Sequence, residues 1–170
     1  MKFFVFLVAA LASFSVVAAS PYKLENIMLL QPDFVLKERM PSIDSFSGYI
    51  KAVQAAAEST LSNEEPSPAS GFIVLAVRPG AKSNVWLDFK PSLPEETASR
   101  LREAIHAVPP LSVKGGTVVF ALNATLWDSP PAAGFPNPPE WSKAMEGHND
   151  SIEIGALVDK FVWPIDADVQ

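Results

Sequence analysis

The chain contains no cysteine and only two histidines among its 170 residues. The lack of cysteine excludes disulfide bonds and thiol chemistry, so the stability of the fold must come from an apolar core. His106 and His148 stand far apart, and neither has a second histidine or cysteine at metal-ligand spacing. Hydrolase elbows, zinc-protease motifs, phosphate-binding loops and dinucleotide fingerprints do not occur. We therefore predict no metal site, no cofactor and no catalytic residue.

Basic residues are also scarce, because 13 Lys and Arg stand against 19 Asp and Glu, for a net charge of −6. Phosphate groups are bound by clustered Lys and Arg, and a surface with net negative charge repels them. The composition thus argues against nucleic acid and anionic lipid as partners.

The first nineteen residues are typical of a cleaved export signal. Lys2 precedes an apolar run from Phe3 to Ala12, and Val17, Ala18 and Ala19 supply the small residues that a signal peptidase accepts. We expect cleavage after Ala19 or one residue earlier, which leaves residues 20–170 as a single periplasmic or secreted domain with no stable membrane insertion. The alternative is a retained anchor, since this segment reaches the lower limit of lengths that span a bilayer.

Two features of the sequence point to different kinds of exporting cell, bacterial or eukaryotic. The absence of disulfides suits a bacterial periplasm, whereas the sequons at Asn123 and Asn149 are typical of eukaryotic secretion. The sequence does not decide between these two origins.

Apolar periodicity predicts two helices. Residues 41–62 carry apolar side chains at spacings of three and four, with Ser42 or Asp44 as the cap. Residues 92–108 show the same apolar spacing, with Ser92 as the expected N-cap, and Pro109 ends the helix.

Three segments are predicted as strands. Residues 71–77 are apolar at every position, which indicates a central strand covered on both faces. Residues 85–89 alternate and form a hairpin with the first strand, while residues 117–122 form a third strand that extends toward Trp127. Residues 22–40 fit either a short strand or a segment along the core. The fold class is therefore α+β, with a small antiparallel sheet and two main helices packed on one face. The predicted core consists of Phe72, Val74, Val77, Leu87, Phe89, Leu101, Ile105, Val118 and Phe120.

Five prolines lie within residues 128–139, next to Phe135. This composition favours extended backbone, either as a surface strap or as a docking segment. Trp127 and Trp141 flank the segment, and we expect them to pin it down or to contact a partner. Trp86 and Asp88 alternate away from the apolar face of their strand. An exposed Trp86 would anchor a ligand or partner, and the alternative is that a helix or the C-terminal segment covers it.

The order of elements over residues 71–127 resembles the C-terminal domain of the TonB and TolA envelope proteins. A strand opens at Gly71, turns at Pro79 and Gly80, and is followed by a second strand, a helix closed by a proline pair, and a strand from Gly116. The resemblance implies protein contact by strand addition at a sheet edge, with neither catalysis nor cofactor. Lys90, Pro91 and Ser92 stand where that family has a serine-serine-glycine turn.

These observations favour an exported, non-enzymatic binding or envelope-accessory protein with a protein partner, whose candidate binding residues are Trp86, Asp88, Trp127, Phe135 and Trp141. The alternative is a small exported hydrolase whose carboxylates converge only in the fold. Its candidate carboxylates are Asp88, Glu95, Asp150 and Glu153. A deep pocket with two or more of them would favour the enzyme.

Overall fold

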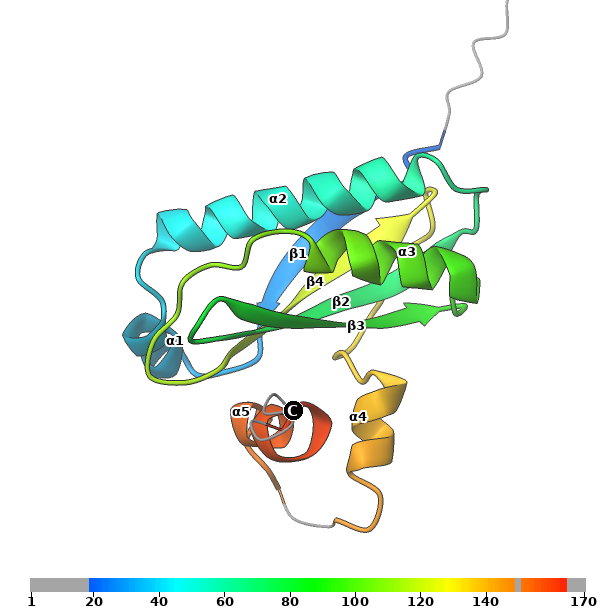
Figure 1. The fold of residues 1–170 in the computed structure, drawn as a ribbon. Coiled ribbons are helices and arrows are strands. Elements are labelled where there is room, and N and C mark those ends of the chain that lie inside the picture. Colours follow the sequence, from blue (N-terminus) through cyan, green and yellow to red (C-terminus); the bar gives the residue numbers. More distant parts are fainter. Residues whose placement is uncertain (1–18, 149–150, 165–170) are drawn as a thin grey trace, which may run out of the picture.

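A four-stranded antiparallel sheet with helices on both faces makes up the fold (Figure 1). The structure is a computed structural model, and it describes residues 19–148 and 151–164. The elements in chain order are β1 (Lys23–Leu29), α1 (Asp33–Arg39), α2 (Ile43–Leu61), β2 (Ala69–Arg78), β3 (Lys82–Lys90), α3 (Glu95–His106), β4 (Val118–Leu126), α4 (Pro139–Ala144), α5 (Ile154–Leu157) and the π-helical turn η1 (Val158–Val162).

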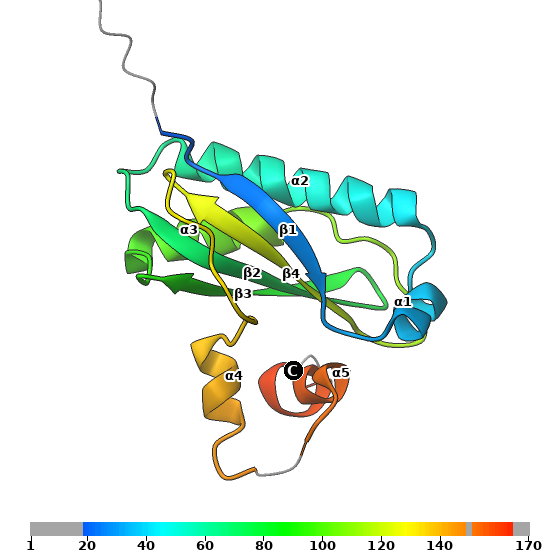
Figure 2. The same cartoon turned by 180° about the vertical axis from the view of Figure 1, so that it is seen from behind.

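The strands follow the order β1-β4-β2-β3, and every neighbouring pair is antiparallel. The last strand, β4, therefore lies between β1 and β2. The connections from β1 to β2 and from β3 to β4 each cross over an intervening strand, and they place α2 and α3 side by side on one face (Figures 1 and 2). The α+β class, the antiparallel sheet and the two main helices on one face are thus confirmed.

The two long helices form where their apolar stripes meet the sheet. Ser42 caps α2, with its Oγ accepting the backbone N–H of Ser45 at 3.1 Å. Helix α3 begins after Pro94, and the cap expected at Ser92 is not formed. Both helices bury apolar residues in the main core cluster, which also contains Ile73 and Phe120.

The second face of the sheet is covered as well, by α4, α5 and η1 (Figure 2). This cover explains why β2 is apolar at consecutive positions, since alternate side chains enter two different clusters. Phe72 and Val74 belong to the cluster on this second face. The other predicted core residues pack on the helix side, where Leu87 is only partly buried.

Residues 22–40, which fitted two interpretations, form a strand and a helix. The strand is β1, which pairs with β4, and α1 follows after Pro32. The Gln31 side chain extends this pairing beyond the strand, because its Oε1 accepts the backbone N–H of Val119 at 2.9 Å. Within residues 19–148 and 151–164, no helix combines the length and apolar character that crossing a membrane requires.

Candidate functional site

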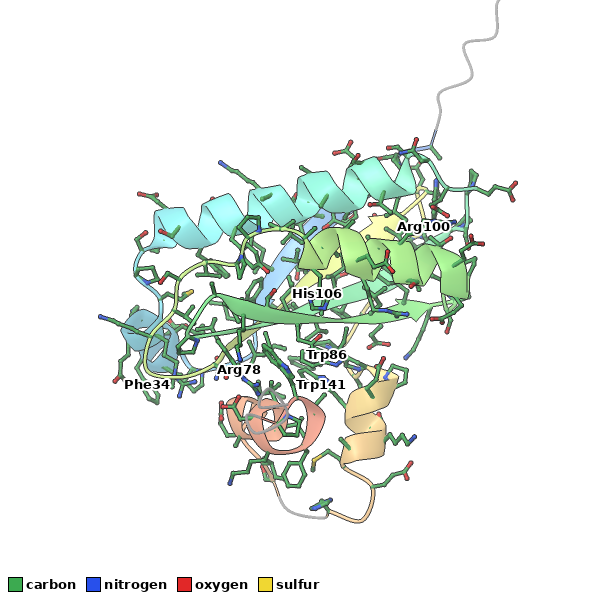
Figure 3. All side chains as sticks on the ribbon, viewed as in Figure 1. Phe34, Arg78, Trp86, Arg100, His106 and Trp141 are labelled. Carbon is green, nitrogen blue, oxygen red and sulfur yellow. The ribbon has the colours of Figure 1, made fainter. Side chains whose placement is uncertain are left out.

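Trp86 lies in the cluster on the second face and is buried. Its ring meets the ring of Trp141 in an edge-to-face arrangement, with centroids 5.5 Å apart (Figure 3). The expectation of an exposed Trp86 is therefore wrong, and the alternative that the C-terminal segment covers it is correct. The alternation of β3 does place Trp86 on the face opposite Phe89, but α4 packs against that face.

Residues 128–138, here called the strap, run from β4 to α4 between two buried tryptophans. Trp127 packs into the cluster on the helix side, whereas Trp141 packs into the cluster on the second face. Both side chains are buried in the fold and offer no exposed ring to a partner.

Two hydrogen bonds with sheet side chains hold the strap against the sheet. The Asn123 Nδ2 donates to the carbonyl of Ala132 at 3.1 Å, and the backbone N–H of Asn137 donates to Asp88 Oδ2 at 2.7 Å. Asp88 is thus a buried structural acceptor. Phe135, between the two bonds, is 81% exposed. Asn123 is buried in β4, so a glycan at this sequon is incompatible with the folded strand. The other sequon, at Asn149, lies outside the described residues.

The candidate carboxylates converge only in part. Asp88 and Glu95 line one hollow of about 250 Å³ between β3, α3 and α4, which also contains Lys90 and Arg102. The Glu95 side chain is 88% exposed, and its carboxylate pairs with Arg102 at 2.8 Å. Of the two candidate carboxylates in the hollow, Glu95 is thus a paired surface group and Asp88 accepts a backbone hydrogen bond, and Glu140 of α4 also lines the hollow.

Glu153 lies elsewhere, at the start of α5. Its Oε2 accepts the backbone N–H of Ala156 at 2.9 Å, and its Oε1 accepts Gln31 Nε2 at 3.2 Å. Burial opposes ionisation of this carboxyl, but the hydrogen bonds from Gly155, Ala156 and Gln31 outweigh it and lower the pKa of Glu153. A low pKa suits a structural cap, whereas a general acid needs a raised one. Asp150 lies outside the described residues.

Neither histidine belongs to a metal-binding cluster in the structure. His106 is exposed in the last turn of α3, and the His148 ring contacts Phe161 at 4.8 Å between centroids. Across residues 19–148 and 151–164, no group of three His, Asp or Glu side chains is arranged to hold a metal ion.

The resemblance implied strand addition at a sheet edge, but the sequence did not indicate that the outer edge of β1 is open. No other strand of the described chain pairs with this edge. Ile27 is 41% exposed and Leu29 is 46% exposed, although both are large apolar side chains. They lie opposite Leu122 and Phe120 of β4, and therefore face the side of the sheet that carries α2.

Two more exposed apolar side chains lie at the end of the molecule toward which β1 runs. Phe34 on α1 is 72% exposed, and Ile43 at the start of α2 is 82% exposed. Figures 1 and 2 both place the end of β1, α1 and the start of α2 at this same end, and Figure 3 shows Phe34 at its periphery. Isolated exposed apolar residues are common, but here they accompany an unpaired strand edge.

Only the first half of the β1 edge carries features that block strand pairing. A bulge interrupts the register between Leu24 and Asn26, and Glu25 within it pairs with Lys23 at 2.9 Å. The Lys23 ammonium and the Thr125 hydroxyl lower the pKa of Glu25, which keeps this position charged. Bulges and edge charges oppose edge-to-edge pairing. From Asn26 to Leu29 the register is regular and no residue is charged.

The opposite edge strand, β3, is different. It begins and ends with exposed lysines, Lys82 and Lys90, and buries Val85, Trp86 and Phe89. Of the two edges, β1 has the more exposed apolar residues. A comparison of the chain with protein-family models, with curated proteins and with solved structures finds no match in any of the three.

Proposed function

We propose that this protein is an exported, non-enzymatic binding module that takes an extended segment of a partner protein along β1 as a fifth strand. The observation that carries this proposal is the regular, uncharged and unpaired edge from Asn26 to Leu29, with Ile27 and Leu29 exposed beside it. The resemblance to the TonB and TolA domains supports the same mode of contact.

Strand addition combines two sources of affinity. The backbone groups on the outer edge of β1 bond to the partner backbone, and the exposed apolar side chains contact alternate side chains of the added strand. Ile27 and Leu29 are two residues apart and share one face, so they match a partner segment with apolar residues at every second position. The partner is therefore an extended segment of alternating apolar and polar residues.

Ile27→Lys should weaken partner binding at least tenfold, because a lysine on an edge strand opposes the docking of another strand. The mature protein serves as bait in the envelope fraction, the captured protein is identified by mass spectrometry, and its dissociation constant is then measured. Amide exchange at residues 26–29 should slow when the partner binds. Far-UV circular dichroism should show an unchanged fold, since Ile27 is half exposed.

Phe135→Lys is the matched control, because Phe135 is an exposed apolar residue on the strap rather than on β1. We expect it to leave the dissociation constant unchanged. If Phe135→Lys weakened binding and Ile27→Lys did not, the strap would be the docking element and the proposal for β1 would be wrong.

A second function is favoured by one observation, the shared hollow of Asp88 and Glu95. A carboxylate pair in one hollow is the arrangement that a small hydrolase requires. A hydrolytic activity of the mature protein that is lost in Glu95→Gln, with partner binding intact in Ile27→Lys, would favour the enzyme over the binding module.

We also propose that the chain is processed after Ala19, so the mature protein should begin at Ser20 or within two residues of it. Ala19 is exposed, whereas Tyr22 is buried and β1 begins at Lys23, so this cleavage leaves the first strand intact. Amino-terminal sequencing of the exported protein tests the prediction. Intact Met1 in the membrane fraction would instead show a retained anchor.

A further inference from the structure

Arg78 is a buried cation at the end of β2, with its side chain 6% exposed. Its Nε and Nη2 donate to Asp159 Oδ1 at 3.2 and 3.0 Å, and Nη2 also donates to the carbonyl of Trp163. The guanidinium lies 3.8 Å from the centroid of the Trp163 ring. Both partner residues, Asp159 and Trp163, belong to the C-terminal cap, defined here as residues 139–163, of which the structure describes 139–148 and 151–163. A buried cation is costly unless it is paired, so Arg78 makes the uncovered sheet face specific for a carboxylate.

The residues that pack around Arg78 in the cluster on this face are apolar, whereas Asp88 and Asn123 on the same face bond to the strap. The sheet contributes Phe72, Val74, Ala76, Trp86, Val119 and Ala121, and the cap contributes Trp141, Leu157 and Val158. The cap is therefore a set of short helical segments that lies on an apolar surface and presents one carboxylate to one buried arginine. A groove that binds an amphipathic helix likewise presents an apolar surface to the apolar face of that helix.

The described residues of the cap contribute no strand to the sheet. The cap is the last part of the chain that the structure describes, and it joins β4 only through the proline-rich strap (Figures 1 and 2). Besides the Arg78 contacts, side chains next to the ends of β1 and β4 bond to the cap: Thr117 Oγ1 donates to Asp159 Oδ1 at 2.6 Å, and Gln31 Nε2 donates to Glu153 Oε1 at 3.2 Å. The helices α2 and α3 lie on the opposite face of the sheet.

We propose that the sheet face around Arg78 and Trp86 is a second docking surface, for a short helical segment with an apolar face and a carboxylate that meets Arg78. The cap is an intramolecular ligand that occupies this surface and competes with such a partner. The surface is separate from the β1 edge, so the two proposals stand independently.

Competition by the cap has a quantitative consequence. When the binding-competent state is a small fraction of the protein, the apparent dissociation constant is the intrinsic one divided by that fraction. A substitution in the cap that weakens its attachment to the sheet should therefore tighten the binding of a separately added segment to the same surface. A substitution of Arg78 also loosens the cap, but it removes the group that recognises the carboxylate.

A fluorescent synthetic peptide of residues 139–163 is the probe, and its anisotropy is measured with the full mature chain. Asp159→Asn in the protein should tighten peptide binding at least tenfold relative to the unchanged protein. Arg78→Gln should give no such gain. A peptide that itself carries Asp159→Asn should bind the Asp159→Asn protein at least tenfold more weakly than the unchanged peptide.

Glu146→Gln is the matched control, because Glu146 is an exposed cap residue whose carboxylate forms no hydrogen bond or ion pair with the described residues. It should leave peptide affinity unchanged. Should Asp159→Asn fail to fold by circular dichroism, Glu153→Ala loosens the cap at its other attachment and should also tighten binding. Equal affinity of the peptide for the loosened and unchanged proteins would overturn the proposal, as would equally tight binding by Arg78→Gln.

Discussion

Gly71→Ala should destabilise the protein by about 3 kcal/mol or more, which is at the upper end of the effect of overpacking a core. A Cβ at this position in β2 would overlap the backbone carbonyl oxygen of Asp88 and lie 2.7 Å from the Cα of Phe89. Both atoms belong to the backbone of the paired strand β3, so no rotation of a side chain can relieve the clash. The β2–β3 pair must separate locally to accept even one methyl group.

Gly48→Ala provides the matched control, because nothing lies within 4 Å of a Cβ at this position in the interior of α2. At this position the same substitution should stabilise the protein by about 0.5–1 kcal/mol, because alanine has a higher helix propensity than glycine. Urea unfolding measures both variants. A Gly71→Ala protein as stable as the unchanged one would show that β2 and β3 do not approach as closely as described.

Phe120→Ala should cost about 3–5 kcal/mol of unfolding free energy, the range for removing a buried aromatic ring. Phe120 is fully buried in β4, and its ring meets Phe46 of α2 edge-to-face at 4.9 Å and Tyr49 at 6.3 Å. The substitution opens a cavity at the centre of the contact between α2 and the sheet. Neighbouring strands hold β4 on both sides, so the backbone cannot close the space.

Phe135→Ala removes the same ring from the exposed strap, and it should change stability by no more than about 0.5 kcal/mol. Thermal and urea unfolding give the loss of unfolding free energy in each variant. Because both variants lose the same ring, the difference between them measures the effect of burial. A loss below about 0.5 kcal/mol for Phe120→Ala would mean that α2 does not pack on β4.

The sequence predicted the layers of the fold where local patterns reflect the environment. The consecutive apolar residues of β2 indicated a strand covered on both faces, and the stripes of α2 and α3 indicated helices with one buried side. The same reasoning could not assign β1, because its residues are half exposed, a bulge shifts its alternation, and its partner β4 lies far along the chain. Periodicity is weak for such an edge strand.

Prediction of the site failed where it depended on what covers a surface. The alternation of β3 placed Trp86 on the correct face, but whether that face is exposed depends on α4 and η1, which return to it from the end of the chain. The partners of Arg78 and Asp88 have the same origin, since Asp159 and Asn137 belong to late segments. The β1 edge could have been predicted by comparing the number of apolar side chains in the sequence with the number that the two helices can cover.

The pairing of the first described strand with the last one also affects how the chain folds. When the amino terminus is synthesised first, β1 emerges long before β4, its partner in the sheet. The β2–β3 hairpin and α2 can form early from local contacts, but β1 has to wait while both of its edges remain open. During that interval Asn26 to Leu29 is exposed to other unfolded chains. A chaperone that holds extended apolar segments would therefore increase the yield of this protein, and its effect would be confined to the time before β4 arrives.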